Sequence, residues 1–145
     1  RIVERGRVAM VVPIFKKQPA RTAVSVGIAE RIDELSGLKD GWLDGRGVAM
    51  PASGLRWLAG WFEDCYSADL PVPFLYPTAE GGVRAEWTLG AHEVSLDFEL
   101  NHGVAYWHDL NLQTDEETAQ TLDMLEDDHW QWILPVLARY AAEQA

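Results

Sequence analysis

The chain has 145 residues, 48% of them hydrophobic, and its 23 Asp and Glu against 12 Lys and Arg give a formal net charge of −11. This length and apolar content predict one folded domain with a sizeable core and argue against intrinsic disorder. The single cysteine, Cys65, excludes an internal disulfide framework and suits the cytoplasm, and no apolar run approaches the roughly 20 residues of a membrane-spanning helix.

The charges are divided unevenly along the chain. Six of the twelve basic residues lie within residues 1–21, where Glu4 is the single acid, so the remaining 124 residues carry a formal charge of −16. From Ala85 to Ala138 there are twelve acids and no Lys or Arg. This segregation favours a basic partner, either another protein or the arm of a second copy. It disfavours nucleic-acid binding by residues 22–145, whereas the basic residues 1–21 remain a candidate for such binding.

The N-terminal segment is predicted to stand apart from the rest. We expect residues 1–21 to form a basic arm or edge strand and residues 22–145 to form a single α+β domain. Val8–Phe15 is apolar and reads as a strand or extended arm, which Pro13 confines to an edge or an end.

Two helices and an extended segment follow. Apolar residues at helical spacing predict a helix over Val24–Leu38 and a second one from about Ser53 to Tyr66. The segment between them, Lys39–Pro51, is rich in Asp-Gly turn dipeptides. Leu70–Pro77 contains three prolines and is therefore expected to be extended, at the edge of a sheet.

The clearest pattern is a β-hairpin. Apolar and polar residues alternate in Val83–Leu89 and again in Glu93–Leu100, and Gly90-Ala91 between them fits a two-residue turn. Both strands keep a period of two in one register, which sets their apolar side chains on one face. The expected pairs are Val83–Phe98, Ala85–Leu96 and Trp87–Val94.

Two registers are open for the next strand, Val104–Leu112. A two-residue turn would set Val94 opposite Asp109 and mix the core face with a charge. A three-residue loop closed by Gly103 avoids this, and we expect that register. Its pairs are Val94–Leu110 and Phe98–Tyr106, and it turns His108 toward the apolar face.

The end of the chain completes an α+β architecture. Thr118–Met124 is expected to be a further strand rather than a helical turn. Asp127 or Asp128 is expected to cap a last helix, in which Pro135 either introduces a kink or marks a late start. The predicted fold has two N-terminal helices, an antiparallel meander of three to five strands, and a C-terminal helix packed on one sheet face.

The polar face of this meander is the predicted interaction surface. In the expected register Arg84 and Trp107 flank Asp97, an arrangement that suits binding. The competing interpretation is a solvated face with one weak cross-strand ion pair. The residues assigned to the interaction face are Arg84, Glu86, Asp97, Glu99, Trp107 and Asp109.

No residue pattern indicates catalysis, a metal or a cofactor. The four histidines lack metal-ligand spacing, and one cysteine cannot complete a zinc site. Asp40 and Asp44 read as turn residues, because Trp42 and Pro51 occupy positions where a calcium loop needs acids. Cys65 has no basic neighbour or nucleophile motif and reads as a small buried hydrophobe.

Two motifs carry a resemblance. Leu38–Gly47 (LKDGWLDGRG) and Tyr76–Trp87 (YPTAEGGVRAEW) resemble small, uncharacterised bacterial proteins that combine a DGW-x-DG turn with a YPTxxGGVxxEW strand. The similarity covers roughly Val24 to the last helix. It implies a bacterial cytoplasmic protein and transfers no catalytic residue. Glu86 is the polar motif residue that a structural role does not explain.

Three functional hypotheses follow. The leading one is a non-enzymatic protein-binding module, of the antitoxin, immunity or inhibitor kind, whose acidic face engages a basic partner. The second is a small enzyme or ligand-binding domain with a site between the 40–47 loop and the 76–87 segment. The third is a homo-oligomer held together by the basic arm. The ligand-site residues of the second hypothesis are Trp42, Asp44, Tyr76 and Glu86.

Overall fold

The computed structural model describes residues 23–143, so the predicted arm over 1–21 and its strand at Val8–Phe15 lie outside the described residues. The expected α+β class is confirmed, and the meander has five strands. The elements are α1 (Ala23–Ser36), α2 (Ala52–Cys65), β1 (Phe74–Pro77), β2 (Val83–Leu89), β3 (His92–Glu99), β4 (Val104–Asn111), β5 (Glu117–Asp123), α3 (Asp127–Trp130) and α4 (Ile133–Glu143).

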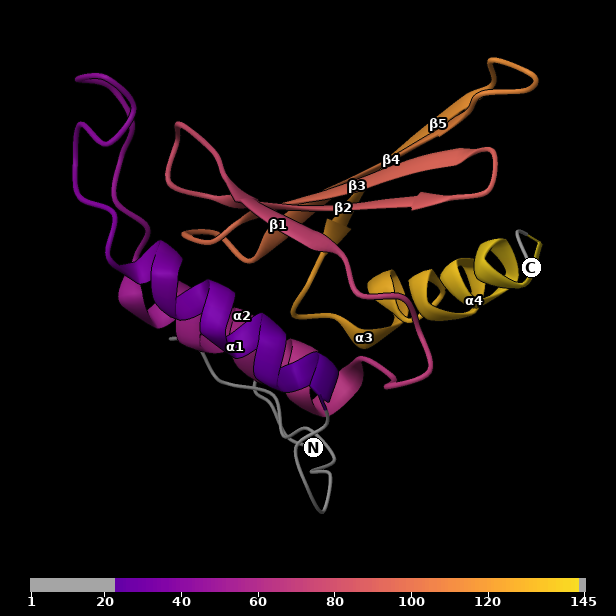
Figure 1. Cartoon of the computed structure of the whole chain (residues 1–145), viewed down its shortest axis with the longest axis horizontal. Helices are drawn as coiled ribbons and strands as arrows, with labels where there is room; N and C mark the ends of the chain where they lie inside the picture. Colours follow the sequence, from indigo (N-terminus) through magenta and orange to yellow (C-terminus); the bar gives the residue numbers. More distant parts are fainter. Residues whose placement is uncertain (1–22, 144–145) are drawn as a thin grey trace.

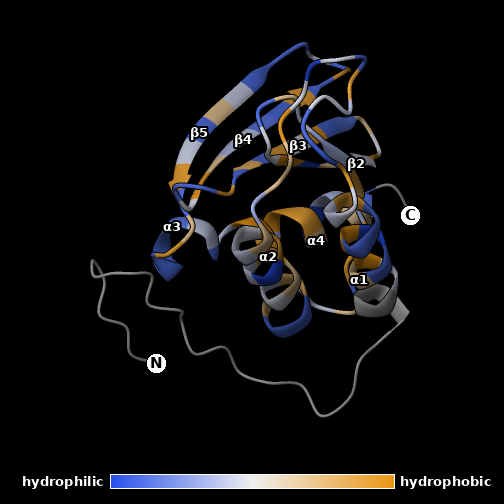
Figure 2. Cartoon of the chain, turned by 90° about the vertical axis from the view of Figure 1, so that its left-hand side faces the viewer, coloured by the Kyte–Doolittle hydropathy of each residue, from blue (hydrophilic) through white to orange (hydrophobic). Residues whose placement is uncertain are grey.

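The described chain forms two layers. The antiparallel strands follow chain order, β1-β2-β3-β4-β5, and the helices all lie on one side of the sheet (Figure 1). The apolar stripes of the helices turn toward the sheet, so hydrophobic residues concentrate between the layers (Figure 2). Within residues 23–143 the other face of the sheet is left uncovered.

Aromatic side chains fill the centre of this core. Trp61 of α2 is fully buried and meets Phe62, Phe98 and Trp130 edge to face, with ring centroids 4.9–5.8 Å apart. Each fully buried large apolar side chain stabilises the fold by about 1.5–3 kcal/mol. Trp61 of α2 thus contacts β3 through Phe98 and the C-terminal region through Trp130.

The first hairpin of the sheet has the predicted register. Val83 lies opposite Phe98 and Trp87 opposite Val94, with Gly90 at φ 61° in the two-residue turn. The prediction of a strand near 118–124 is also confirmed, as β5. No helix of the described residues is long and apolar enough to cross a bilayer.

The predicted register between β3 and β4 is wrong by one residue. Val94 lies opposite Asp109, and Leu96 lies opposite Trp107, across a four-residue loop from Leu100 to Gly103. Because strand side chains alternate between faces, the slip moves every β4 side chain to the other face. Trp107 and Asp109 are therefore buried under the helices, whereas Tyr106 is exposed on the uncovered face.

The start of the C-terminal helices also differs from expectation. Glu126, not Asp127 or Asp128, occupies the N-cap of α3, and both aspartates fall in its first turn. Their charge still suits the positive end of a helix. Pro135 lies in the first turn of α4, where it needs no intrahelical hydrogen bond, so the late start that we considered is the observed one.

The second glycine of the YPTxxGGV motif has a steric role. Its amide donates to the Thr78 hydroxyl at 2.9 Å, and a Cβ at Gly82 would lie 2.5 Å from the carbonyl oxygen of Phe98. Since that oxygen belongs to the strand backbone, it cannot move aside cheaply. The motif glycine thus lets the β1–β2 turn approach β3.

We expect Gly82→Ala to lower the free energy of unfolding by about 1–3 kcal/mol, the usual cost of forcing an extra carbon into a packed site. Gly27→Ala is the matched control, because a Cβ on that exposed face of α1 meets nothing within 4 Å. The control should raise stability by about 0.5–1 kcal/mol through helix propensity. Urea unfolding followed by tryptophan fluorescence measures both, and equal effects would contradict the steric argument.

Candidate functional site

The uncovered face of the sheet gathers four of the six residues assigned to the interaction face. Strand alternation sets Arg84 and Glu86 of β2 opposite Asp97 and Ser95 of β3 on this face. Glu99, two residues beyond Asp97, shares the same side. These side chains come from the confirmed hairpin, which is why their common location followed from the sequence.

Arg84 is already engaged by its neighbours. Its Nε and Nη2 donate to the two carboxylate oxygens of Asp97 at 2.6 and 3.0 Å, and its Nη1 lies 3.8 Å from Glu86 Oε2. The hydrogen bond to Asp97 raises the pKa of Arg84 above its ordinary value. Arg84 is the one Lys or Arg in the five strands, so the other strand carboxylates have no Lys or Arg partner on the sheet.

A depression of about 230 Å³ lies beside this ion pair. Glu86, Glu93 and His108 are among the residues that line it, and the imidazole Nε2 of His108 lies 2.8 Å from a carboxylate oxygen of Glu117. Carboxylates around a concave surface favour a cationic group. The lining residues are Arg84, Glu86, Trp87, Thr88, Glu93, Val94, Ser95, His108 and Leu110.

Exposed aromatic rings border the carboxylates. Phe74 and Tyr76 of the edge strand β1 are 71% and 43% exposed and stack on each other with centroids 6.5 Å apart. Tyr106 of β4 is 45% exposed, and its hydroxyl donates to Glu99 at 3.4 Å. Exposed aromatics beside charged groups are typical of protein interfaces. Sequence reasoning did not assign Phe74, Tyr106 or His108 to this surface.

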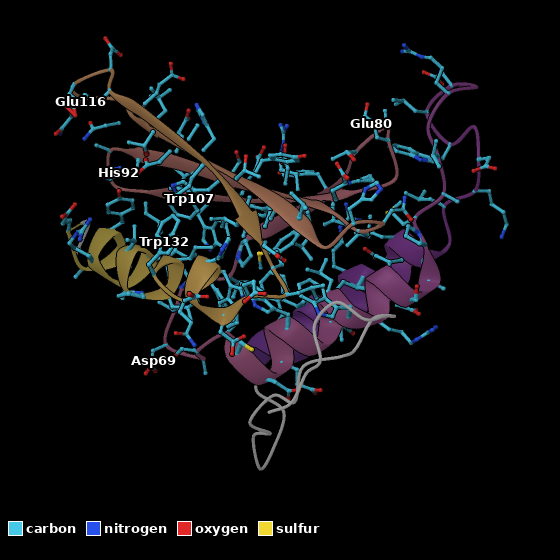
Figure 3. The ribbon with its side chains drawn as sticks, turned by 180° about the vertical axis from the view of Figure 1, so that it is seen from behind. Asp69, Glu80, His92, Trp107, Glu116 and Trp132 are labelled. Atoms are coloured by element: carbon cyan, nitrogen blue, oxygen red, sulfur yellow. The ribbon has the colours of Figure 1, made fainter. Side chains whose placement is uncertain are left out.

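Trp107 and Asp109 belong to the covered face and form no part of this surface. The indole of Trp107 is 3% exposed and packs edge to face on Trp132, with centroids 5.0 Å apart, between the sheet and the C-terminal helices (Figure 3). The prediction that both residues face outward is corrected here. Its cause is the one-residue slip in the β3–β4 register.

Asp109 is a buried carboxylate with a partner on each oxygen. Tyr140 of α4 donates to Oδ2 at 2.5 Å, and His92 Nδ1 lies 3.0 Å from Oδ1. The rings of His92 and Tyr140 stack face to face, with their centroids 3.5 Å apart and an angle of 6° between their planes. Burial, reinforced by the hydrogen bond to Asp109, raises the pKa of Tyr140 to about 12. This arrangement ties α4 to the sheet and engages both oxygens of a carboxylate that is buried beneath it.

The residues predicted as a ligand site do not converge. Trp42 donates its indole N–H to the carbonyl of Val48 at 3.1 Å and packs against Gly47, inside its own loop. Asp44 is an exposed turn residue at φ 48°. The depression described above includes Glu86 but neither Trp42, Asp44 nor Tyr76 among its lining residues.

Among residues 23–143, no group of three or more His, Cys, Asp and Glu side chains is arranged to hold a metal ion. Burial raises the pKa of the Cys65 thiol to about 12, and the charges of Asp64 and Asp127 act in the same direction. A thiol with a raised pKa is a poor nucleophile at neutral pH.

No protein-family model matches the chain, and neither the curated proteins nor the solved structures gave a match.

Replacing Tyr140 by Phe tests the buried carboxylate. Tyr140→Phe should lower the free energy of unfolding by about 1–3 kcal/mol, because it removes the donor to Asp109 Oδ2 and leaves a buried acceptor unsatisfied. Tyr106→Phe, the same change on the exposed face, should alter stability by less than about 0.5 kcal/mol. Denaturant unfolding measures both, and similar losses would refute the role of this contact.

The thiol of Cys65 gives a second, chemical test. A pKa of about 12 leaves almost no thiolate at about pH 8, since the thiol stays protonated until the pH approaches that value. The native chain should therefore react with a disulfide reagent at least about 100-fold more slowly than the chain unfolded in guanidinium chloride. Comparable rates in the two states would show that burial neither shields the native thiol nor raises its pKa.

Proposed function

We propose that this chain is a non-enzymatic protein-binding module, of the antitoxin, immunity or inhibitor kind, that engages a basic partner through the uncovered face of its sheet. One observation carries the proposal. The strands present several carboxylates on this face, while their one guanidinium, that of Arg84, is bound to Asp97. A partner with exposed Lys or Arg supplies the cations that the sheet lacks.

The dimensions of the face fit part of a protein interface. Four strands about 25 Å long and the shorter β1, all about 4.8 Å apart, offer roughly 500 Å². A stable interface buries about 800 Å² per partner, so contacts must extend beyond the strands. Phe74 and Tyr76 at the β1 edge supply exposed apolar area where such an extension begins.

The carboxylates at the depression suggest how the partner is anchored. Glu86 and Glu93 border a space of about 230 Å³, which suits a single Lys or Arg side chain. Sites for small organic ligands usually occupy about 300–1,000 Å³. The ligand-site hypothesis is therefore less well supported, the more so because Trp42, Asp44 and Tyr76 do not contribute to this space. The resemblance to bacterial proteins suggests the bacterial cytoplasm as the place to search for the partner.

Charge reversal on the open face tests the proposal. The immobilised wild-type chain should retain a basic protein from bacterial lysate at about 50 mM salt and release most of it at about 500 mM, because screening shortens the reach of surface charges. The double variant Glu86→Lys and Glu93→Lys should bind the identified partner at least about tenfold more weakly in a titration.

The matched control carries the same charge change on α1, at the exposed Glu30 and Asp33. The double variant Glu30→Lys and Asp33→Lys should bind within about twofold of the wild type. Equal weakening by both variants would show that the loss of binding comes from the net charge of the chain and not from Glu86 and Glu93. Retention of no basic protein at low salt would count against the proposed function as a whole.

A further inference from the structure

The two edges of the sheet are built differently. At the β1 edge, prolines occupy positions 71, 73 and 77, and the guanidinium of Arg31 donates to the carbonyl oxygen of Leu75 at 3.0 Å. Prolines and a side-chain cap are common means of preventing further strand addition. The β5 edge, Glu117–Asp123, contains no Pro, Lys or Arg.

Strand β5 also projects from the body. Residues 117–121 are exposed, on both faces of the strand, and in the described part of the chain no further strand pairs with its outer edge. Figure 1 shows this part of β5 rising away from the helices toward the β4–β5 turn. The edge is therefore open to another strand.

The direction of its hydrogen-bonding groups can be assigned. The amide of Met124 donates to the carbonyl of Gly103, so even-numbered residues here face β4. Alternation then directs the N–H and C=O groups of Glu117, Ala119 and Thr121 away from the sheet. At Asp123 the outward amide is already bound, because it donates to His129 Nδ1 at 3.1 Å. The open template thus covers residues 117–121.

The charges around this template define its occupant. Acids lie at both ends, with Asp115, Glu116 and Glu117 near the β4–β5 turn and Asp123 at the other end. Figure 3 shows Glu116 at the tip of that turn, pointing away from the body. A strand that adds here should be apolar or neutral in its middle and basic at both ends.

We propose that β5 accepts Val8–Phe15 of a second copy of this chain, so that two copies exchange arms. Arg7 precedes this apolar segment and Lys16-Lys17 follow it, which places cations on both sides of an eight-residue strand. Arg7 and Lys16 lie about 30 Å apart in an extended chain, and Glu117 and Asp123 about 20 Å, so the cations fall at or just beyond the two acidic ends of β5.

Pro13 fits this arrangement and limits it to two copies. A proline can join a sheet only where its missing N–H faces away from the neighbouring strand. Residues 9, 11, 13 and 15 would then face outward, and even-numbered residues of the segment, Met10 among them, would pair with Glu117, Ala119 and Thr121. The added strand becomes a new edge that carries a proline. Reciprocal exchange therefore closes as a dimer, since the new edge resists a third strand.

The geometry favours a second copy over the chain's own arm. The arm continues into α1, which lies beneath the β1 edge, and Figure 2 shows α1 and β5 on opposite sides of the molecule. Crossing the sheet takes about 19 Å and passing between the layers about 10 Å, which combine to a straight-line distance of about 21 Å. The seven residues 16–22 span at most about 24 Å, which leaves no slack for a path around the helices.

The test uses the full chain and the mass measured by light scattering. The wild type should be a dimer, and Thr121→Pro should be monomeric, because it removes an outward N–H and blocks strand addition. Thr121→Ala keeps that N–H and should remain dimeric. In the arm, Met10→Pro should dissociate the dimer, whereas Val11→Pro, at an outward position, should not. Circular dichroism confirms that each variant is folded.

A second measurement needs no variant. A synthetic peptide of residues 5–17, added in excess, should convert the wild-type dimer to monomer and lower the apparent mass about twofold. A monomeric wild type, or a dimer that survives both Thr121→Pro and the peptide, overturns the proposal. Thr121→Pro should still bind the basic partner through the open face, so failure here and failure of the proposed function are separate results.

Discussion

The buried carboxylate of Asp109 is the interaction on which the two faces of the sheet depend. Burying a charge is unfavourable unless it is paired and hydrogen-bonded, and Tyr140 and His92 satisfy one carboxylate oxygen each. With that cost offset, β4 can adopt the register that buries Trp107 against Trp132. The same contact links α4 to the sheet across 31 residues of sequence.

The register decides what the protein presents to its surroundings. In the alternative register, Trp107 and Asp109 would lie on the open face, and Tyr106 would be packed under the helices. The observed register instead exposes Tyr106 and His108 beside Glu99 and the depression. The outer surface therefore carries a tyrosine and a histidine in place of a tryptophan and an aspartate, and so holds one acid fewer than the sequence suggested. A contact inside the core thus sets the chemistry of the interaction face.

Local patterns were sufficient for α1, α2 and the first hairpin but not for β4 or for the start of the C-terminal helices. In β2 and β3 the apolar and polar positions alternate strictly, so one register satisfies both strands. In β4 both sets of alternate residues contain apolar and aromatic side chains, and Asp109 appeared to exclude the correct set. Its partner Tyr140 lies in α4, whose position no local pattern supplies. Arg84, Glu86, Asp97 and Glu99 were placed correctly because they belong to the hairpin.

The acids around β5 also disfavour pairing between the β5 edges of two copies. Two β5 edges from separate copies could in principle pair with each other, since both expose backbone groups over residues 117–121. Side-by-side pairing would bring Glu117 and Asp123 of one strand close to the acids of the other, and like charges facing each other across strands are destabilising. Under the proposed exchange of arms, the β5 edge therefore favours a basic strand over the β5 edge of another copy. Because the cations of the chain are concentrated in residues 1–21 and its acids in residues 22–145, the charges favour pairing of an arm with β5 over pairing of two β5 edges.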